Sequence, residues 1–366
     1  MAGSTIGTLF KITTWGESHG AGVGVVIDGC PSGLPLDEDM IQQFLNRRRP
    51  GQTPFSTPRK EDDQVRILSG VFEGKTTGTP ISLMVENTSA RPRDYSQIAS
   101  CYRPGHADYC FDRKYGFRDY RGGGRSSGRE TIGRVAAGAV AVMILERMGI
   151  SFTTFTKAIG PILLTEEEID LSLIGKTSTG LPNASINAQA ESFLKECMME
   201  KDSAGGVVEC RVAGLPVGLG EPVFDKLDAC LAKAILSIGA VKAFELGEGT
   251  NAPRLKGSEN NDPFRMVNGN IQKLTNHAGG TLGGMSDGSE LILRAHIKPT
   301  SSIFSPQQTV TKDGEEVTIQ IKGRHDPVIV PRAVVVVEAM TALTLLDLLM
   351  INMTARLDSI VDFYGR

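Results

Sequence analysis

The chain has 366 residues, with 39 Lys and Arg against 42 Asp and Glu, and a net charge of -3 at neutral pH. Hydrophobic residues make up 40% and charged residues 22%, the balance of a soluble globular protein, and the slight acidity argues against bulk nucleic-acid binding. The six cysteines include no C-x-x-C pair, and no basic-then-apolar signal opens the sequence, so we expect a cytoplasmic protein with reduced thiols. The longest apolar run, residues 333–350, contains Glu338 and Asp347. It predicts a buried or subunit-contact helix and no membrane span.

The first two predicted strands, residues 8–15 and 23–27, flank the sequence Gly-Glu-Ser-His-Gly at 16–20. This segment matches the G-x-S-x-G pattern of serine hydrolases, which requires a helix directly after the serine. A glycine-interrupted, strand-like segment follows instead. We therefore favour a tight turn that presents Ser18 and His19 at the mouth of a sheet, with a serine hydrolase as the alternative.

Residues 37–49 predict a helix that is capped by Asp37 and ends in the basic sequence Arg-Arg-Arg-Pro-Gly. A basic last turn suits the helix dipole, so these arginines have a structural interpretation as well as a ligand-binding one. Strands are predicted at 65–71 and 81–86. In the loop at 103–108 (Arg-Pro-Gly-His-Ala-Asp), His106 stands between charged neighbours, an arrangement that orients the ring and suits a titrating group.

Residues 121–131 (Arg-Gly-Gly-Gly-Arg-Ser-Ser-Gly-Arg-Glu-Thr) predict an anion site. Consecutive glycines let the backbone turn tightly and approach a ligand closely. The spacing of Ser127 and Glu130 predicts a capping box and a helix that begins at about residue 128. The N-terminus of a helix favours negative charge, and the lack of a following Lys-Ser/Thr excludes an ordinary phosphate loop. The predicted ligand is a small polyanion held by the planar forks of nearby arginines, namely Arg121, Arg125 and Arg129.

The remaining predicted elements alternate irregularly, and hairpin turns outnumber crossover helices. Strands are predicted at 153–159, 206–212, 241–247 and 291–297, helices at 187–200 and 224–238, a helix start at the acidic run 166–168, a hairpin at 310–321, and a last apolar helix opened by Pro331. Loops rich in Gly, Ser or charge lie at 276–288, 298–302 and 323–327. This pattern favours an α+β fold with antiparallel sheets over a parallel doubly wound sheet. No Pro/Ser linker divides the chain, which predicts one domain over residues 1–366.

Several long motifs, in order along nearly the whole chain, resemble those of the chorismate synthase family. They are Gly-Glu-Ser-His-Gly at 16–20, Arg-Pro-Gly-His-Ala-Asp at 103–108, Gly-Arg-Ser-Ser-Gly-Arg-Glu at 124–130, Lys-Pro-Thr-Ser-Ser at 298–302 and Gly-Arg-His-Asp-Pro at 323–327. The resemblance implies a single catalytic domain, a sandwich of antiparallel sheets and helices, assembled as a homotetramer. It also implies a lyase that eliminates phosphate from 5-enolpyruvylshikimate-3-phosphate to give chorismate, the last step of the shikimate route. The family requires reduced FMN although its reaction has no net redox change.

The same resemblance implies roles for individual residues. Ser18, Arg48, Arg103 and Arg129 would bind the substrate, with Arg324 beside them. His19 resembles the acid that meets the departing phosphate, His106 the group that protonates or balances the flavin, and Asp326 a carboxylate that assists as a base. The FMN contacts would be Arg125, Ser126, Ser127, Asn251, Ala252, Gly283, Lys298, Pro299, Thr300, Ser301, Ser302 and Arg324. No metal ligands are implied.

One position departs from the family pattern. Several relatives have a second basic residue shortly after the Arg-Arg-Arg-Pro-Gly segment, where this chain has Pro54. A second contact to substrate or nicotinamide is therefore in doubt there, with Arg59 and Lys60 as candidate substitutes. Whether NADPH reduces the flavin on this chain, or an external reductase does, is left open by the sequence.

Apart from the hydrolase, a second alternative is a non-catalytic module that binds polyanions or RNA through its arginines. For the lyase we expect Arg129 at the surface, where it would contribute more to substrate affinity than to folding.

Overall fold

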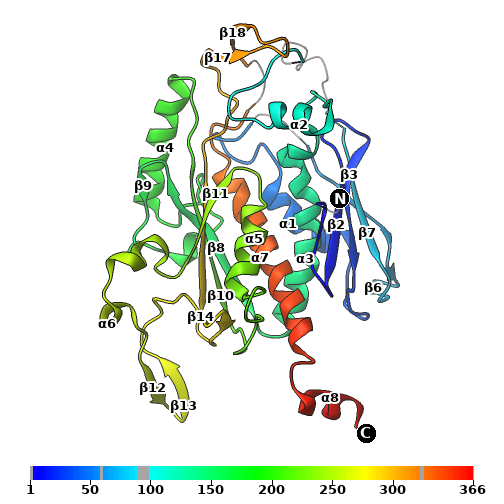
Figure 1. The fold of residues 1–366 in the computed structure, drawn as a ribbon, viewed down its shortest axis with the longest axis vertical. Coiled ribbons are helices and arrows are strands. Elements are labelled where there is room, and N and C mark those ends of the chain that lie inside the picture. Colours follow the sequence, from blue (N-terminus) through cyan, green and yellow to red (C-terminus); the bar gives the residue numbers. More distant parts are fainter. Residues whose placement is uncertain (1–2, 58–60, 89–98, 322–324, 366) are drawn as a thin grey trace.

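Two five-stranded antiparallel sheets form the outer layers of the structure, and helices fill the space between them (Figure 1). The structure, a computed structural model, describes residues 3–57, 61–88, 99–321 and 325–365. This arrangement confirms the α+β prediction and the sandwich of antiparallel sheets and helices.

The first sheet has the strand order β1-β2-β3-β7-β4 and lies on the right of Figure 1. Along β7, Ile81, Leu83 and Val85 are buried and the residues between them are less so, the period of two that one covered face requires. This buried face is the one that packs against the helices. The bounds are β1 (Thr5–Ile6), β2 (Lys11–Gly16), β3 (Gly22–Asp28), β4 (Val65–Ser69) and β7 (Ile81–Glu86).

The second sheet has the order β11-β16-β10-β8-β9 and lies on the left of Figure 1. Its strand β16 shows the same alternation, with Leu291, Leu293, Ala295 and Ile297 buried. The bounds are β8 (Ser151–Ile159), β9 (Ile162–Leu163), β10 (Gly206–Ala213), β11 (Val241–Leu246) and β16 (Leu291–Ile297).

The helices between the sheets are α1 (Glu38–Arg48), α3 (Thr131–Arg147), α5 (Leu227–Leu236) and α7 (Val330–Asn352). α3 packs on the first sheet, α7 on the second, and the two helices pack on each other. A Cβ atom on Gly138 would lie 2.3 Å from the Cβ of Ala339, so the crossing of α3 and α7 requires glycine. Both helices are buried around most of their circumference.

α7 is long and apolar enough to cross a membrane, but 72% of the relevant window is buried inside the structure. This confirms the prediction of a buried helix. Near its C-terminal end, the carboxylate of Asp347 accepts hydrogen bonds from the backbone N–H groups of Thr8, Leu9 and Phe10, at 2.7–3.0 Å. Asp347, a charged residue in an otherwise apolar helix, therefore anchors the start of the chain.

Other elements surround this core. The helices are α2 (Asp108–Tyr115), α4 (Ala184–Met199), α6 (Gly257–Asn260) and α8 (Leu357–Tyr364), and the small hairpins are β5–β6 (Val71–Phe72 and Lys75–Thr76), β12–β13 (Phe264–Val267 and Asn270–Lys273), β14–β15 (Thr281–Leu282 and Met285–Ser286) and β17–β18 (Gln307–Val310 and Glu316–Ile319). Short 3-10 turns are η2 (Gly124–Ser126), η3 (Gly128–Glu130), η4 (Leu171–Leu173) and η5 (Gly249–Arg254).

One predicted element is wrong. The acidic run at 166–168 forms turns and no helix, because Glu166 reaches back to form ion pairs with Lys157 and Arg211 on the second sheet. None of the six cysteines forms a disulfide bond, and four of them are buried, as expected of reduced thiols. Burial raises the pKa of Cys30 to about 11 and that of Cys210 to about 12, so neither thiol ionises at neutral pH.

Candidate active site

The segment at 121–131 connects the end of the α2 region to α3, and its glycines give it its shape. Gly122, Gly123 and Gly124 have φ angles of +66°, +94° and +54°, which residues with a Cβ rarely adopt. Ser127 caps the next turn by accepting from the N–H of Arg129 at 3.3 Å, as predicted. Glu130 does not complete the capping box, because its carboxylate accepts from Thr14 and Arg134. A 3-10 turn therefore precedes α3, which begins three residues later than expected, at Thr131.

Two histidines from distant loops lie against consecutive glycines of this segment. A Cβ on Gly122 would lie 2.3 Å from Cε1 of His19, and one on Gly123 would lie 3.0 Å from Cε1 of His106. Adjacent Cα atoms are about 3.8 Å apart, so the two imidazoles flank a single Gly-Gly unit. His19 comes from the turn between β2 and β3, and His106 from the loop before α2. Ser18 belongs to the same group, since its Oγ lies 3.1 Å from Nδ1 of His19.

The segment at 298–302 approaches the same group from the end of β16. Lys298 Nζ donates to the carbonyl of Gly105 at 2.6 Å and to Ser301 Oγ at 2.9 Å, and Ser301 Oγ donates to the same carbonyl at 2.9 Å. Gly105 directly precedes His106. An ammonium and a hydroxyl therefore lie next to the backbone that carries His106, in a geometry that suits a phosphate or another anionic group.

Several polar atoms in this region fit an additional ligand. Thr300 Oγ1 is buried without a hydrogen-bond partner among the described residues. Ser126 Oγ donates to the carbonyl of Gly123 at 2.7 Å. Ser302, two residues after Thr300, is also buried. Since buried polar groups normally have partners, the hydroxyl of Thr300 is compatible with a contact to the polar edge or the phosphate tail of FMN. Pro299 joins Lys298 to Thr300 and contributes no backbone N–H.

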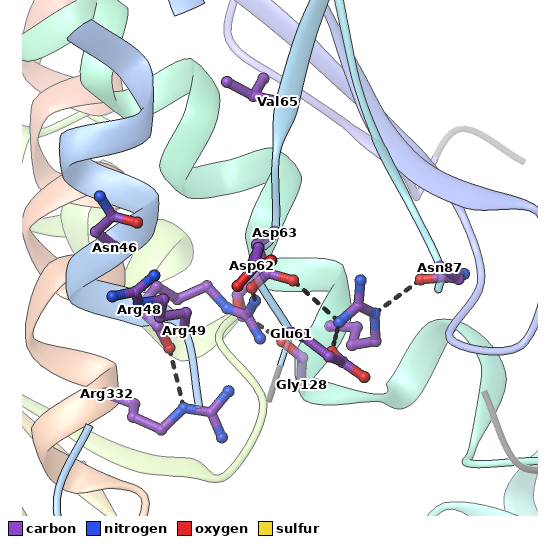
Figure 2. A network of polar contacts seen from close by, with 12 residues as sticks. Asn46, Arg48, Arg49, Glu61, Asp62, Asp63, Val65, Asn87, Gly128 and Arg332 are labelled. Carbon is purple, nitrogen blue, oxygen red and sulfur yellow. Dashed lines mark hydrogen bonds and ion pairs between the residues drawn. The ribbon is translucent and has the colours of Figure 1, made fainter. Parts of the chain in front are cut away.

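Arg48 and Arg129 meet at one buried carboxylate. Asp63 Oδ2 lies 2.7 Å from Nη1 of Arg48, and its Oδ1 lies 3.1 Å from Nη1 of Arg129. Figure 2 shows Asp63 and Glu61 with Arg48, beyond the end of α1. Burial raises the pKa of Asp63 and lowers that of Arg48 to about 10, because desolvation outweighs the attraction between the two groups.

Arg129 is therefore not the surface residue expected from the sequence. Its side chain is 9% exposed, and it also forms an ion pair with Glu61. The purely structural interpretation of Arg48 as a solvated capping residue is likewise wrong, since its side chain is 3% exposed. Folding stability and ligand binding are consequently linked at both arginines.

Arg103 and His106 share one carboxylate, that of Asp108. Nε and Nη2 of Arg103 donate to both oxygens of Asp108 at 2.7 Å, a bidentate pair with each side chain 3% exposed. Nδ1 of His106 lies 3.4 Å from Asp108 Oδ1. Burial alone would raise the pKa of Asp108, but hydrogen bonds from Arg103 and the neighbouring His106 hold it well below its usual value. Asp108 thus fixes the position of an arginine and a histidine together.

Asp326 lies at the N-terminal end of α7 with both oxygens engaged. Oδ1 accepts from the N–H of Thr57 at 2.8 Å, and Oδ2 accepts from Nη1 of Arg332 at 2.6 Å. Arg332 also donates Nε to the carbonyl of Arg48 at 3.0 Å, so this carboxylate is tied to the arginine group (Figure 2). Arg324 lies outside the described residues, as do Arg59 and Lys60, whereas Pro54 is exposed.

Most of the other candidate FMN contacts have partners away from the two histidines. Arg125 turns its guanidinium toward β2, where it donates to the carbonyls of Thr14 and Gly16 at 3.1 Å. Asn251 and Ala252 lie in η5, and Asn251 donates to Glu248 at 2.7 Å. Gly283 lies in the turn between β14 and β15, and Lys298 follows the end of β16. The roles of these residues stay predictions.

The two alternatives account for the geometry less well. Ser18 lies in a turn between antiparallel strands and no helix follows it, so it does not form a nucleophile elbow. Arg48, Arg103 and Arg129 are buried and paired with carboxylates, whereas a nucleic-acid surface requires exposed cations.

Sequence reasoning missed the carboxylates that organise these arginines. Asp108 stands in the motif at 103–108, where it was expected only as a charged neighbour of His106, and Asp63 carries no motif. A signal was present at residues 61–63, Glu-Asp-Asp, because an acidic run follows the arginine-rich end of a predicted helix.

Comparison with known proteins identifies the family of this chain. Residues 10–350 match the family model described as chorismate synthase. The chain is 63% identical over 366 residues to a chorismate synthase of Agathobacter rectalis, and 52% identical over 352 residues to one of Opitutus terrae, covering 100% and 96% of those proteins and 100% and 94% of this chain. A solved structure described as a crystal structure of chorismate synthase superposes with a TM-score of 0.75 at 29% identity, over 98% of this chain and 97% of that one. The chain therefore belongs to the chorismate synthase family, and it is a lyase of aromatic biosynthesis.

Proposed function

We propose that this chain eliminates phosphate from 5-enolpyruvylshikimate-3-phosphate to give chorismate, in a reaction that depends on reduced FMN. The single observation that carries the proposal is the placement of His19 against Gly122 and of His106 against the adjacent Gly123. Two groups able to donate or accept protons thus converge on one short segment, next to Lys298 and near a buried pair of arginines.

The substrate carries two carboxylates and a phosphate, so its binding requires several cations in one place. Arg48 and Arg129, which both contact Asp63, would supply two of these, and Arg103, which shares Asp108 with His106, would supply another. The hydroxyl of Ser18 would donate a hydrogen bond to the same ligand. An arginine fork and a carboxylate or phosphate form bonds that are worth roughly 1.5–3 kcal/mol each.

His19 would deliver a proton to the departing phosphate. The glycine at 122 lets its ring lie against the backbone without obstruction. His106, oriented by the carboxylate of Asp108 at 3.4 Å, would hold a proton near the cofactor. Asp326 is the proposed base, and Arg332 and the N–H of Thr57 fix its orientation. A positioned acid or base of this kind contributes about 10²–10⁴-fold to the rate.

The proposed cofactor site comprises Lys298, Pro299, Thr300, Ser301 and Ser302, together with Ser126, Ser127 and Arg125. Asn251, Ala252, Gly283 and Arg324 are proposed from the family resemblance. When bound, reduced FMN would supply electron density to the substrate ring as phosphate leaves. The residues of this chain would orient the two ligands and exclude water. NADPH is a candidate reductant, and an external reductase is the alternative source of electrons.

We also propose that residues 1–366 form a single catalytic domain that assembles as a homotetramer in the cytoplasm. One layer of helices is shared by both sheets, which supports one domain. The β12–β13 hairpin and α8 extend from the body (Figure 1), and Met266, Ile271 and Phe363 are 66–73% exposed there. Apolar side chains on projecting elements are typical of subunit contacts.

The test is phosphate release from 5-enolpyruvylshikimate-3-phosphate under anaerobic conditions, with FMN reduced by dithionite, with oxidised FMN, and with none. Turnover with reduced flavin alone is expected. Equal turnover in all three reactions would exclude the proposed function. A parallel reaction with NADPH in place of dithionite identifies the source of electrons.

A further inference from the structure

Asp63 joins the two arginines of the candidate anion site (Figure 2). Oδ2 accepts from Arg48 Nη1 at 2.7 Å, and Oδ1 accepts from Arg129 Nη1 at 3.1 Å. The side chain of Asp63 is 0% exposed, and its backbone is held at a φ of +47°, a conformation uncommon for a residue other than glycine. Because each oxygen serves one arginine, Asp63 sets the distance between the two guanidinium groups.

Each guanidinium is also oriented by a neutral side chain at Nε. Arg48 donates to Thr131 Oγ1 at 3.1 Å, and Arg129 donates to Asn87 Oδ1 at 2.8 Å. Two positive charges in such a poorly solvated place repel each other unless a negative charge stands between them. The arrangement therefore depends on the carboxylate of Asp63.

Glu61 brings a second carboxylate from the same short segment. It forms an ion pair with Nη1 of Arg129, the nitrogen that Asp63 also contacts. Glu61 touches the arginine pair at Arg129, and its side chain is 9% exposed, whereas Asp63 touches both arginines and is fully buried. Two arginines and Asp63 leave one net positive charge, and Glu61 cancels it. An incoming anion therefore competes with Glu61 before it competes with Asp63.

We propose that Asp63 is a positioning residue of the anion site and that Glu61 is an internal competitor for it. In the ligand-free protein, Glu61 occupies the place on Arg129 that a carboxylate or phosphate of the substrate takes. On binding, the Glu61 carboxylate moves to solvent, and Asp63 stays between the arginines. The inference rests on the proposed function in one respect, the assignment of Arg48 and Arg129 to the substrate.

The chain offers a matched set of variants for the test, because residues 61–63 are all acidic. Glu61→Gln, Asp62→Asn and Asp63→Asn each remove one negative charge from consecutive positions. The side chain of Asp62 is exposed, and its backbone carbonyl, which accepts from Gln42, is unchanged by the substitution. Asp62→Asn therefore measures the general effect of lost charge near the site.

The measurement is the Kd of 5-enolpyruvylshikimate-3-phosphate by isothermal titration calorimetry on the full chain, without reductant, so that no turnover occurs. We expect Glu61→Gln to lower Kd by about threefold to tenfold, and Asp62→Asn to change it by less than about twofold. Asp63→Asn is expected to raise Kd by about tenfold or more. Glu61→Gln should lower the melting temperature while it raises the affinity for the titrated compound. A residue with a merely structural role would not give this combination.

Each other outcome has a definite meaning. Equal Kd values for Glu61→Gln and Asp62→Asn would overturn the competitor role, and tighter binding by Asp63→Asn would overturn the positioning role. Because Asp63→Asn leaves two buried arginines without their carboxylate, Asp63→Glu serves as a second variant if the first does not fold. It keeps the charge and shifts the carboxylate by one methylene, so wild-type affinity in Asp63→Glu would refute the positioning role. Failure of the wild-type protein to bind this compound would refute the proposed function itself.

Discussion

Replacing Gly122 with alanine tests whether His19 acts from the position that the structure gives it. The new Cβ would lie 2.3 Å from Cε1 and 2.4 Å from Nδ1 of His19. Carbon atoms in contact prefer about 3.5–4.0 Å, so the ring must move by roughly 1 Å or more. A displacement of about 1 Å at a catalytic group costs on the order of 10²-fold in rate. The φ of +66° adds backbone strain of about 1–2 kcal/mol.

Gly74→Ala is the matched control for this experiment. Gly74 has a φ of +72° in the β5–β6 turn, and a Cβ there would meet nothing within 4 Å. Both variants therefore carry similar backbone strain, and Gly122→Ala alone displaces His19. We expect similar losses of melting temperature in the two variants, and a loss of about 10²-fold in kcat for phosphate release in Gly122→Ala alone. If Gly122→Ala kept more than about a tenth of the wild-type kcat, or if Gly74→Ala lost as much, the placement of His19 would be refuted.

Four further substitutions separate catalysis from stability. His19→Ala and His106→Ala should each lower kcat by about 10²–10⁴-fold with a native circular dichroism spectrum, and near-wild-type rates in both would refute their roles. Gly138→Ala should cost about 1–3 kcal/mol in urea unfolding, since its Cβ would lie 2.3 Å from that of Ala339, while kcat per folded molecule stays unchanged. The pKa of Asp108 is lowered in the folded state, so its contribution to stability is present above its unfolded pKa of about 3.9 and is lost as pH falls through the folded value. Asp108→Asn should therefore be less stable than wild type at pH 7, and the difference should shrink only in strong acid; a constant difference across that range would contradict the assignment.

Local patterns predicted most of the fold because they report burial directly. The alternation in β7 and β16 gave those strands with the bounds that the structure has, and Asp37 caps α1 as expected. What local patterns could not give is the position of a helix between two layers. α3 is buried on nearly all sides, so its apolar residues follow no single face, and its contact with α7 depends on Gly138.

The candidate site was likewise predictable from the sequence only in part. Ser18, His19 and His106 stand in uncommon motifs, and the motif at 121–131 predicted the loop that brings them together. The partners of the arginines were not predictable, because an ion pair such as Arg48 with Asp63 depends on where α1 and the segment before β4 meet in space. For the same reason Arg129 was expected at the surface, although it is buried.

The most direct measurement is a crystal structure of this protein with FMN and 5-enolpyruvylshikimate-3-phosphate bound. We predict one pocket in which His19 and His106 both contact the bound pair of ligands, with a carboxylate or phosphate of the substrate on Arg129. A structure in which the two ligands occupy separate sites, or in which either histidine lies out of reach of both, would contradict the account.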